Sequence, residues 1–457
     1  MSAQLESLDF KDNPFFYLNA DAVSVIRSPN EFFSKLKLLV GTAKNRIYFA
    51  SLYFGVGEKN DELVSCFFES FNKSADLRGT VLLDYCRASR EECNSCTKLV
   101  SLKKEFPNRF DVALFHSPLL RNIWKKVLPQ RWNEIIGVQH MKIYVVDDGV
   151  IISGANLSTD YFTNRQDRYV LLRNANLADF YVDLINLVAR LSFRLAPSGA
   201  VTLHDGCPEH PYNGSYSLFC EILKSDIQSL LGRWNDKQRN AVTHKYDTVV
   251  YPLVQFGAAG LHDGNQAIIQ FIRDTDQSDQ YDLYLASGYF NPTRAYADAL
   301  LDTCKHCRVL LASRESNGFY GAKGFSRQVP HIYLSYVNVF LNEIVRRDQQ
   351  HRILLNEYAR DGWTFHAKGI WLRGTKPDGR YYTIIGSSNL GCRSVFRDLE
   401  SQLVMVTENS ALKRELQNEC DSLFMFGKRI ENTDAVRNNF GVNFFIRLIA
   451  RMLKNYF

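Results

Sequence analysis

Short apolar runs alternate with amphipathic stretches along most of the chain, and the alternation starts twice. An apolar face at helical spacing over Phe32–Ala43 precedes the apolar run Ile47–Phe54. A second helical stretch, Ala267–Arg273, precedes the similar run Leu283–Phe290. Helical stretches followed by short buried strands are typical of α/β sheets. The pattern therefore predicts an α/β fold, with helices beside a sheet in each half.

The two apolar runs belong to an internal duplication. Ile47–Phe54 reads IYFASLYF, and Leu283–Phe290 reads LYLASGYF. The next apolar runs, Thr80–Leu83 and Arg308–Leu311, correspond in the same way. The offset of roughly 230 residues is too long for a solenoid repeat and suits two similar domains. A chain of 457 residues is also long for a single core.

The boundary between the halves is expected in a segment rich in Pro, Gly and Ser, Leu195–Tyr216, which a helical stretch over Leu218–Val242 follows. We therefore expect a first domain over residues 1–200, a linker and connecting helix over residues 201–246, and a second domain over residues 247–457.

Composition and charge exclude few classes of protein or binding partner. With 46% hydrophobic and 23% charged residues, the chain has the composition of an ordinary folded protein. The net charge of +6 indicates a mild attraction to nucleic acid, an anionic bilayer or a phosphorylated substrate, without choosing among them. No run of about 18 apolar residues occurs, so any membrane contact is expected to be peripheral. The start of the chain resembles neither a secretory signal nor a transit peptide.

The ten cysteines are expected to be reduced thiols in an intracellular compartment. Two C-x-x-C pairs, Cys93 with Cys96 and Cys304 with Cys307, leave a four-thiolate zinc site open as an alternative. Both pairs lie beside charged, helix-like stretches, and no other motif supports joining them. We therefore favour free, buried thiols.

Candidate chemistry in the first half begins at His140-Met-Lys142. Alternate residues of a strand share one face, so His140 and Lys142 are expected to project together. The Asp148-Gly149 pair between two apolar runs predicts a tight hairpin, which would bring the strand ending at Asn156 beside the histidine. One small surface would then display a histidine, a lysine and an asparagine.

The second half repeats this arrangement with His366, Lys368 and Asn389. The spacing from histidine to asparagine is 16 residues in the first copy and 23 in the second. The additional residues fit inside a longer polar loop, Gly374–Gly379, so the face that carries the motif need not differ.

A carboxylate follows each asparagine after eleven residues, Asp167 in the first half and Glu400 in the second. A carboxylate bonded to one imidazole nitrogen fixes the tautomer and leaves the other nitrogen free to attack or to move a proton. A single H-x-K motif is uninformative, and each carboxylate could be a solvated charge. The recurrence of histidine, lysine, asparagine and carboxylate in a duplicated chain indicates one active site built by both halves.

These residues resemble the phospholipase D superfamily, whose signature is H-x-K-x4-D followed by G-S-x-N. Within it, nearly the whole chain from about Asn13 to Phe457 is similar to the eukaryotic phosphatidylglycerophosphate synthases. The stretches that carry this similarity are Ser153–Ser158, Tyr161–Tyr169, Asn317–Gly324, Gly362–Lys368 and Arg393–Glu400. The resemblance implies two phospholipase D-like domains, each a mixed β-sheet flanked by helices, related by pseudo-two-fold symmetry with the active site between them.

The chain departs from the signature at two positions. Asp147 completes the first motif, whereas Arg373 stands at the corresponding position of the second. In the superfamily this aspartate supports the site and does not react. The first copy also has Ser153-Gly154 where Gly-Ser is expected, which leaves Ser387 as the candidate for a hydroxyl contact to phosphate.

The resemblance implies CDP-diacylglycerol as donor and glycerol 3-phosphate as acceptor, giving phosphatidylglycerol phosphate and CMP. We assign the nucleophile to His140, which stands in the complete motif, and the acid/base to His366. The groups expected to bind the non-bridging oxygens are Lys142, Lys368, Asn156 and Asn389. The candidate anion contacts, which could equally be salt-bridge partners, are Arg165, Arg168, Arg393 and Arg397.

A diacyl substrate requires membrane contact, and two segments could supply it. Val442–Phe457 places basic residues at helical spacing among apolar ones, which suits either a helix at an anionic bilayer surface or a helix docked on the core. Leu119–Leu128 combines apolar and basic residues just before His140. The resemblance further implies a mitochondrial location, peripheral on the inner membrane.

We expect no required cofactor and no metal, although a divalent ion assisting the pyrophosphate stays open. No aromatic and basic track for a single strand is evident, so no nucleic acid partner is expected. Three other functions stay open: a phospholipase D-type hydrolase or nuclease, a phosphatidylserine synthase, and an inactive scaffold that binds anionic lipid. The oligomeric state is not predicted.

Overall fold

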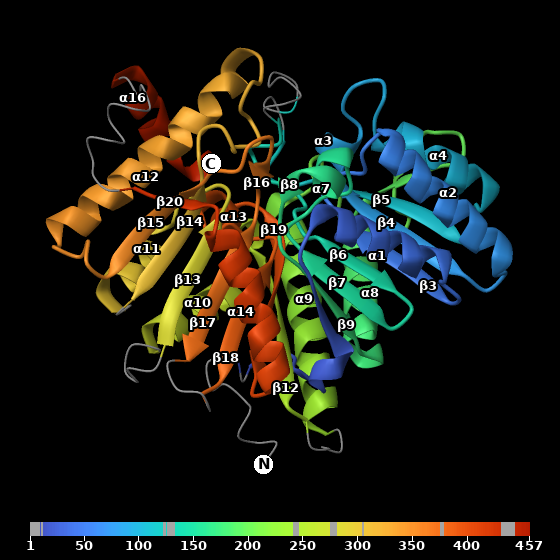
Figure 1. Cartoon of the computed structure of the whole chain (residues 1–457). Helices are drawn as coiled ribbons and strands as arrows, with labels where there is room; N and C mark the ends of the chain where they lie inside the picture. The colour runs from blue at the N-terminus through green and yellow to red at the C-terminus, as the bar shows by residue number, and fades with distance from the viewer. Residues whose placement is uncertain are drawn as a thin grey trace.

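Two nine-stranded sheets lie side by side, with helices outside them and between them (Figure 1). The computed structural model describes residues 10, 12–121, 125, 133–240, 246–274, 281–303, 306–374, 379–430 and 444–457. The predicted α/β fold with two mixed, helix-flanked sheets is confirmed.

The first sheet has the strand order β11-β10-β5-β4-β3-β6-β7-β9-β2. Its strands are β2 (Val23–Ile26), β3 (Arg46–Ala50), β4 (Arg78–Asp84), β5 (Phe110–Phe115), β6 (Ile143–Val146), β7 (Gly149–Ser153), β9 (Tyr169–Arg173), β10 (Phe193–Leu195) and β11 (Val201–Leu203). Strands β3, β4 and β5 pair in parallel, and the other pairs are antiparallel. The sheet is therefore mixed.

The second sheet has the order β1-β12-β19-β18-β17-β13-β14-β15-β20. Its strands are β1 (Phe16–Leu18), β12 (Thr248–Phe256), β13 (Tyr281–Ser287), β14 (Cys307–Ala312), β15 (Ile353–Tyr358), β17 (Lys368–Gly374), β18 (Tyr381–Gly386), β19 (Leu399–Thr407) and β20 (Gly427–Arg429). Strands β13, β14 and β15 are parallel, and β17, β18 and β19 continue antiparallel. This central order repeats that of the first sheet, as the duplication predicts.

Two strands lie across the expected domain boundaries. β1, near the start of the chain, pairs with β12 of the second sheet. β11 lies beyond residue 200, yet it pairs with β10 at the edge of the first sheet. The connecting helix that follows, α9 (Tyr216–Arg239), begins two residues before the expected start.

Helix α1 (Pro29–Gly41) shows why the amphipathic stretches fold as they do. Ser28 accepts a hydrogen bond from the Glu31 N–H, and Pro29 occupies the first turn, where its missing N–H costs nothing. Phe32, Leu36 and other apolar residues at helical spacing are buried against the first sheet. Burial of this apolar stripe contributes most of the stability of such a helix.

The helices form three groups around the sheets. Outside the first sheet lie α1, α2 (Glu58–Lys73) and α4 (Ser95–Glu105). Outside the second lie α10 (Asp263–Asp274), α11 (Arg294–Thr303), α12 (Val329–Arg346) and α16 (Phe444–Leu453). The central group is α8 (Ala175–Arg190), α9 and α14 (Ser410–Phe424), whose apolar residues join one hydrophobic core with inner faces of both sheets.

The sequence predicts that no segment spans a membrane and that the cysteines are reduced thiols. Within the described residues, no helix combines the length and the apolar character needed to cross a bilayer. Cys93 and Cys96 of the first pair are free thiols, and Cys96 is buried whereas Cys93 is exposed. Cys304 lies outside the described residues, so the four-thiolate alternative stays a prediction that the structure does not test.

Candidate active site

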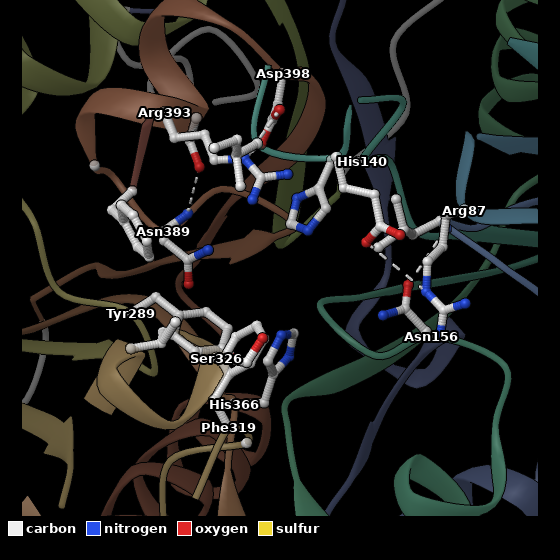
Figure 2. Close-up of a pocket in the computed structure, with 18 of the residues that line it drawn as sticks. Arg87, His140, Asn156, Tyr289, Phe319, Ser326, His366, Asn389, Arg393 and Asp398 are labelled. Atoms are coloured by element: carbon white, nitrogen blue, oxygen red, sulfur yellow. Dashed lines mark hydrogen bonds and ion pairs between the residues drawn. The ribbon is translucent and has the colours of Figure 1, made fainter. Parts of the chain in front are cut away.

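A cavity of about 360 Å³ opens where the two halves meet, and both motif histidines line it (Figure 2). Figure 2 shows the two imidazole rings facing one opening from different elements. The sequence-predicted residues that line this cavity are His140, Asn156, Arg165, His366, Asn389 and Arg393. The structure thus brings the two motifs together in one site.

The backbone positions the two histidines in the same way. The His140 N–H donates to the Leu399 carbonyl at 2.8 Å, and the His366 N–H donates to the Gln166 carbonyl at 2.8 Å. Leu399 and Gln166 directly precede Glu400 and Asp167 in the chain. Each histidine segment therefore lies against the carboxylate segment of the other half, and β16 (Thr364–Phe365) pairs with β8 (Arg165–Gln166) at this junction.

Each histidine is oriented by a carboxylate from the opposite half. His140 Nδ1 lies 3.0 Å from both carboxylate oxygens of Glu400, and His366 Nδ1 lies 2.6 Å from Asp167 Oδ2. Because Nδ1 is engaged in both rings, Nε2 is the nitrogen available to a substrate. Asp167 and Glu400 are at most 1% exposed and do not line the cavity, so they orient the histidines and do not bind substrate.

The two motif lysines lie beneath the rings but differ in their contacts. Lys142 Nζ donates to the His140 carbonyl at 2.6 Å, and Lys368 Nζ donates to the His366 carbonyl at 2.6 Å. Lys368 Nζ also lies 2.7 Å from Nδ1 and 3.3 Å from Nε2 of His366. Among the described residues, the second half therefore places an ammonium group against its histidine ring, and the first half does not.

Burial shifts the protonation of the whole cluster toward neutral forms. Burial, and then the nearby motif lysine, lowers the pKa of both His140 and His366. Burial lowers the pKa of Lys368 to about 8 and raises the pKa of Asp167 to about 6. It also raises the pKa of Glu400. Neutral imidazoles are the form in which one ring can attack and the other can accept a proton.

The two asparagines are not equivalent. The Asn156 amide is engaged, because its Nδ2 donates to the Tyr161 hydroxyl and its Oδ1 accepts from the Leu52 N–H. The Asn389 side-chain oxygen is buried and has no hydrogen-bond partner among the described residues. Asn389 lines the cavity, and the N–H₂ group of the same amide, not the oxygen, is the donor that can bind a phosphate oxygen.

The reversed Ser-Gly of the first copy reflects a close approach between the halves. A Cβ atom at Gly154 would lie 2.6 Å from Asp167 Oδ1 and 2.9 Å from the Lys368 side chain. Only glycine leaves room there for the second-half lysine. Ser387 is fully buried, and its hydroxyl donates to the Ser401 carbonyl, so the structure does not place it in the cavity.

Of the four candidate arginines, two line the cavity and two do not. Arg393 pairs with Asp398 at 3.0 Å, and Arg165 donates to the Thr364 hydroxyl at 3.1 Å, both at the cavity wall. Arg168 is instead buried between the halves, where it pairs with Glu419 at 2.8 Å. Arg397 binds the Asn455 and Ile136 carbonyls. Arg168 and Arg397 are therefore held by other parts of the protein and do not line the cavity.

Asp147 and Arg373, at which the two motifs differ, lie outside the cavity. Asp147 forms the turn between β6 and β7 with φ of +49°, and its carboxylate accepts from the N–H groups of Lys44, Asn45 and Arg46. Arg373 pairs with Asp421 at 2.6 Å. The resemblance implies that Asp147 supports the active site, but in the structure it shapes the predicted hairpin and does not line the cavity.

The structure adds cavity residues that the motif did not reveal. Tyr289 lies edge-on to His366 at 5.5 Å between ring centroids, and Tyr53 stacks under Arg87 at 4.0 Å. Tyr53 and Tyr289 occupy equivalent positions of the duplicated runs Ile47–Phe54 and Leu283–Phe290. An alignment of the two runs could therefore have identified both residues. The apolar side of the cavity is formed by Phe319, Ala322, Phe325, Val329 and Phe457.

One group near the histidines has donor atoms of the kind that bind metals. Single atoms of His140, Asp398 and Glu400 lie within 4.8 Å of one another. Glu400 already bonds His140, and Asp398 accepts from the Val138 N–H and pairs with Arg393. These donors fit a metal poorly, because binding would require the ligands to release partners that position the site.

The structure describes much of the first expected membrane segment, Val442–Phe457, but little of the second, Leu119–Leu128. Helix α16 docks on α12, where Ile446 and Ala450 join Ile332 and Tyr336 in a small apolar cluster. Leu448 and Met452 on its other side remain 45% and 73% exposed. Most of Leu119–Leu128 lies outside the described residues.

Comparison with known proteins gives relatives over nearly the whole chain. No protein-family model matches. The chain is 38% identical to the mitochondrial CDP-diacylglycerol–glycerol-3-phosphate 3-phosphatidyltransferase of Gallus gallus, over 97% of this chain and 85% of that protein. It is 36% identical to the enzyme of the same name from Homo sapiens, over 97% of this chain and 84% of that protein. It is 34% identical to the CDP-diacylglycerol–glycerol-3-phosphate 3-phosphatidyltransferase of Schizosaccharomyces pombe, over 89% of each.

A solved structure shares the fold. The phosphatidylserine synthase of Haemophilus influenzae covers 98% of both chains with a TM-score of 0.74 and 19% sequence identity. At this identity the likeness shows the common fold alone.

Proposed function

The chain belongs to the family of CDP-diacylglycerol–glycerol-3-phosphate 3-phosphatidyltransferases, and we propose that it transfers the phosphatidyl group through a covalent phosphatidyl-histidine. CDP-diacylglycerol is the donor, glycerol 3-phosphate is the acceptor, and the products are phosphatidylglycerol phosphate and CMP. The observation that carries this mechanism is the pair of carboxylate-oriented histidines that face one cavity. One ring can attack while the other moves a proton.

In the first step, Nε2 of one histidine attacks the phosphatidyl phosphorus. A nitrogen–phosphorus bond forms, the bond from phosphorus to the CMP oxygen breaks, and CMP leaves with that electron pair. Lys142, Lys368 and the Asn389 amide lie near the two rings and can stabilise the charge on the non-bridging oxygens. Because CMP leaves as a phosphate, this step needs little protonation.

In the second step, the other histidine acts as a base. Its Nε2 takes the proton of the glycerol hydroxyl while the hydroxyl oxygen attacks phosphorus, and the nitrogen–phosphorus bond breaks. An alcohol is a poor nucleophile until its proton is removed, so this step makes the larger demand on the base. Two displacements in succession retain the configuration at phosphorus.

We assign the nucleophile to His140 and the base to His366. Attack turns the ring into a cationic phosphoryl-imidazolium, which the two oxygens of Glu400 at 3.0 Å stabilise in His140. Lys368 Nζ lies against the ring of His366 and would oppose the same charge in a lasting covalent adduct there, whereas a base carries its proton only until solvent removes it. Asp147 no longer supports this assignment, because it lies away from His140.

The reaction is proposed to need no metal. Lys142 and Lys368, buried beside the histidines, and two arginines of the cavity wall supply positive charge without one, and the carboxylates that could bind an ion already have partners. Transfer that persists in excess EDTA supports this proposal, and loss of transfer restored by Mg²⁺ contradicts it.

The acyl chains are proposed to lie along the apolar side of the cavity, with the protein peripheral on an anionic mitochondrial membrane. Phe319 of this wall is 39% exposed, and the neighbouring Tyr320 is 54% exposed. Leu448 and Met452 on α16 add exposed apolar side chains beside the basic Arg447 and Arg451. The relatives from Gallus gallus, Homo sapiens and Mus musculus are named mitochondrial, which supports this location.

One assay tests the proposed activity. Purified protein is incubated with CDP-diacylglycerol and then offered glycerol 3-phosphate, serine or water, and CMP release is measured. Release that depends on glycerol 3-phosphate and disappears in His140→Ala supports the proposal. Release with serine would indicate a phosphatidylserine synthase, release with water alone a hydrolase, and no release a scaffold; each of these overturns it.

A binding assay tests the membrane surface separately. Flotation with vesicles containing anionic lipid should recover the wild type, and Leu448→Glu/Met452→Glu should reduce recovery several-fold without loss of folding. Equal recovery of both proteins would contradict the assigned surface.

A further inference from the structure

The polar end of the cavity is formed by two arginines that the H-x-K motifs do not include. Arg87 belongs to helix α3 (Tyr85–Ala88), and Arg90 follows it closely. Both line the cavity together with Glu134, across from the apolar wall around Phe319. In Figure 2, Arg87 lies beside Asn156 on the first-half side, and Phe319 lies on the second-half side.

Arg87 is the less engaged of the two guanidinium groups. Arg90 pairs with Glu134 at 2.5 Å. Within the described part of the chain, the Arg87 side chain makes no hydrogen bond, and its one ion-pair contact is Glu134 at 3.9 Å. The guanidinium stacks on the Tyr53 ring at 4.0 Å. Stacking fixes its plane and leaves its N–H edge free for a bidentate phosphate contact.

The position of Arg87 is tied to the catalytic histidine through one buried carboxylate. Asp84 Oδ1 accepts from the Arg87 N–H at 2.9 Å, and Asp84 Oδ2 accepts from the Gln139 N–H at 3.2 Å. Gln139 directly precedes His140. The same side chain therefore holds the arginine and the histidine segment at a fixed separation.

Charge and polarity indicate which substrate this end receives. Arg90 is paired with both Glu134 and Glu91, whereas among the described residues Arg87 has only the distant contact to Glu134, so Arg87 is the cation that is least neutralised at this end. The acyl chains of the donor require the apolar wall, and the acceptor is the substrate whose far end is a phosphate dianion. Arg165 and Arg393 are each held at the wall by a protein partner at about 3 Å, whereas the Arg87 side chain makes no hydrogen bond to the described residues.

We infer that Arg87, positioned by Asp84 and Tyr53 beside the Arg90–Glu134 pair, binds the phosphate of glycerol 3-phosphate and so selects a phosphorylated acceptor. This inference rests on the proposed function, since it names the acceptor subsite of the same cavity. It explains how such a site would prefer glycerol 3-phosphate to glycerol, serine or water.

The test compares two reactions of the same protein. Transfer to glycerol 3-phosphate uses the acceptor subsite, whereas exchange of labelled CMP into CDP-diacylglycerol uses only the donor half-reaction. Loss of a charge-assisted contact is expected to raise KM for glycerol 3-phosphate about 10- to 100-fold in Arg87→Gln. The loss of transfer should exceed the loss of CMP exchange at least tenfold, and Arg87→Lys should recover part of it.

Glycerol as acceptor and a surface arginine provide the controls. The ratio of kcat/KM for glycerol 3-phosphate to that for glycerol should fall at least tenfold in Arg87→Gln. Arg233→Gln, at a side chain that is 66% exposed on α9, should leave the ratio unchanged. An unchanged ratio in Arg87→Gln, or an equal loss of exchange and transfer, would overturn the inference. Absence of transfer in the wild type would instead overturn the proposed function.

Discussion

The two histidines of the cavity have the same support but different surroundings. Each is held by a backbone bond and by a carboxylate from the opposite half. Among the described residues, Lys142 bonds the backbone carbonyl of His140, whereas Lys368 lies against the ring of His366. The duplication therefore supplied a symmetrical frame, and the contacts of single side chains made its halves chemically unequal.

The cross-pairing of carboxylates gives the largest expected effect. Asp167→Asn and Glu400→Gln remove the acceptor that fixes each imidazole, and each should lower kcat by about 10²- to 10⁴-fold. Glu400→Gln should also lose the burst of CMP release without acceptor, since it impairs His140. Asp167→Asn should keep that burst, since it impairs the base.

Each variant changes the carboxylate of one histidine and leaves that of the other histidine in place, so the two variants are controls for each other. Identical burst behaviour in Asp167→Asn and Glu400→Gln would contradict the unequal roles. Circular dichroism and thermal melting of each variant separate loss of chemistry from loss of folding.

Arg168 tests the contact between the halves. Its guanidinium bonds Glu419, the Ile384 carbonyl and the Thr383 hydroxyl of the second half, all buried. Arg168→Met leaves Glu419 uncompensated and should cost about 3–5 kcal/mol of stability, measured as a lower urea midpoint and Tm. Arg168→Met/Glu419→Gln should recover part of the loss. A higher KM with unchanged stability would instead restore Arg168 as a substrate contact.

The pH dependence of transfer tests the environment of Lys368. Burial lowers the pKa of Lys368 to about 8, and the protonated form supplies charge to the phosphate. Transfer should therefore be retained below about pH 8 and fall as pH rises through this value. Lys368→Arg, which stays protonated up to a pKa above about 12, should move the alkaline limb upward if it retains activity. An alkaline limb in the same place would assign it to another group.

Asp147 gives the smallest expected effect. Asp147→Asn weakens charge-assisted bonds to three backbone N–H groups and should cost about 1–2 kcal/mol of stability. Because the residue lies outside the cavity, kcat/KM should stay within about twofold of the wild type. A tenfold fall in kcat/KM in a folded variant would show that the motif aspartate acts on the reaction.

Much of this arrangement could be read from the sequence because it depends on periodicity and repetition. The duplicated runs predicted two related sheets, and the Asp148-Gly149 turn predicted the hairpin between β6 and β7. The recurrence of histidine, lysine, asparagine and carboxylate located the site. Such patterns are local or repeated, so they are visible without knowledge of the packing.

The rest depends on contacts between segments that are distant in the chain. The eleven-residue spacing did not show that Asp167 serves the histidine of the other half, because that follows from how the halves meet. Arg168 and Arg165 look alike in sequence, yet one is buried against Glu419 and the other lines the cavity. Arg87 lies in no motif, and only the fold brings it to the site.

The most direct test of the unequal halves is the location of the covalent intermediate. Wild-type protein is mixed with CDP-diacylglycerol without acceptor, denatured rapidly at neutral or alkaline pH to preserve the nitrogen–phosphorus bond, and analysed by peptide mass spectrometry. His366→Ala, which should form the adduct but not turn it over, provides a background in which it accumulates. The account predicts a phosphatidyl group on His140 in both proteins, whereas an adduct on His366 of the wild type would contradict it.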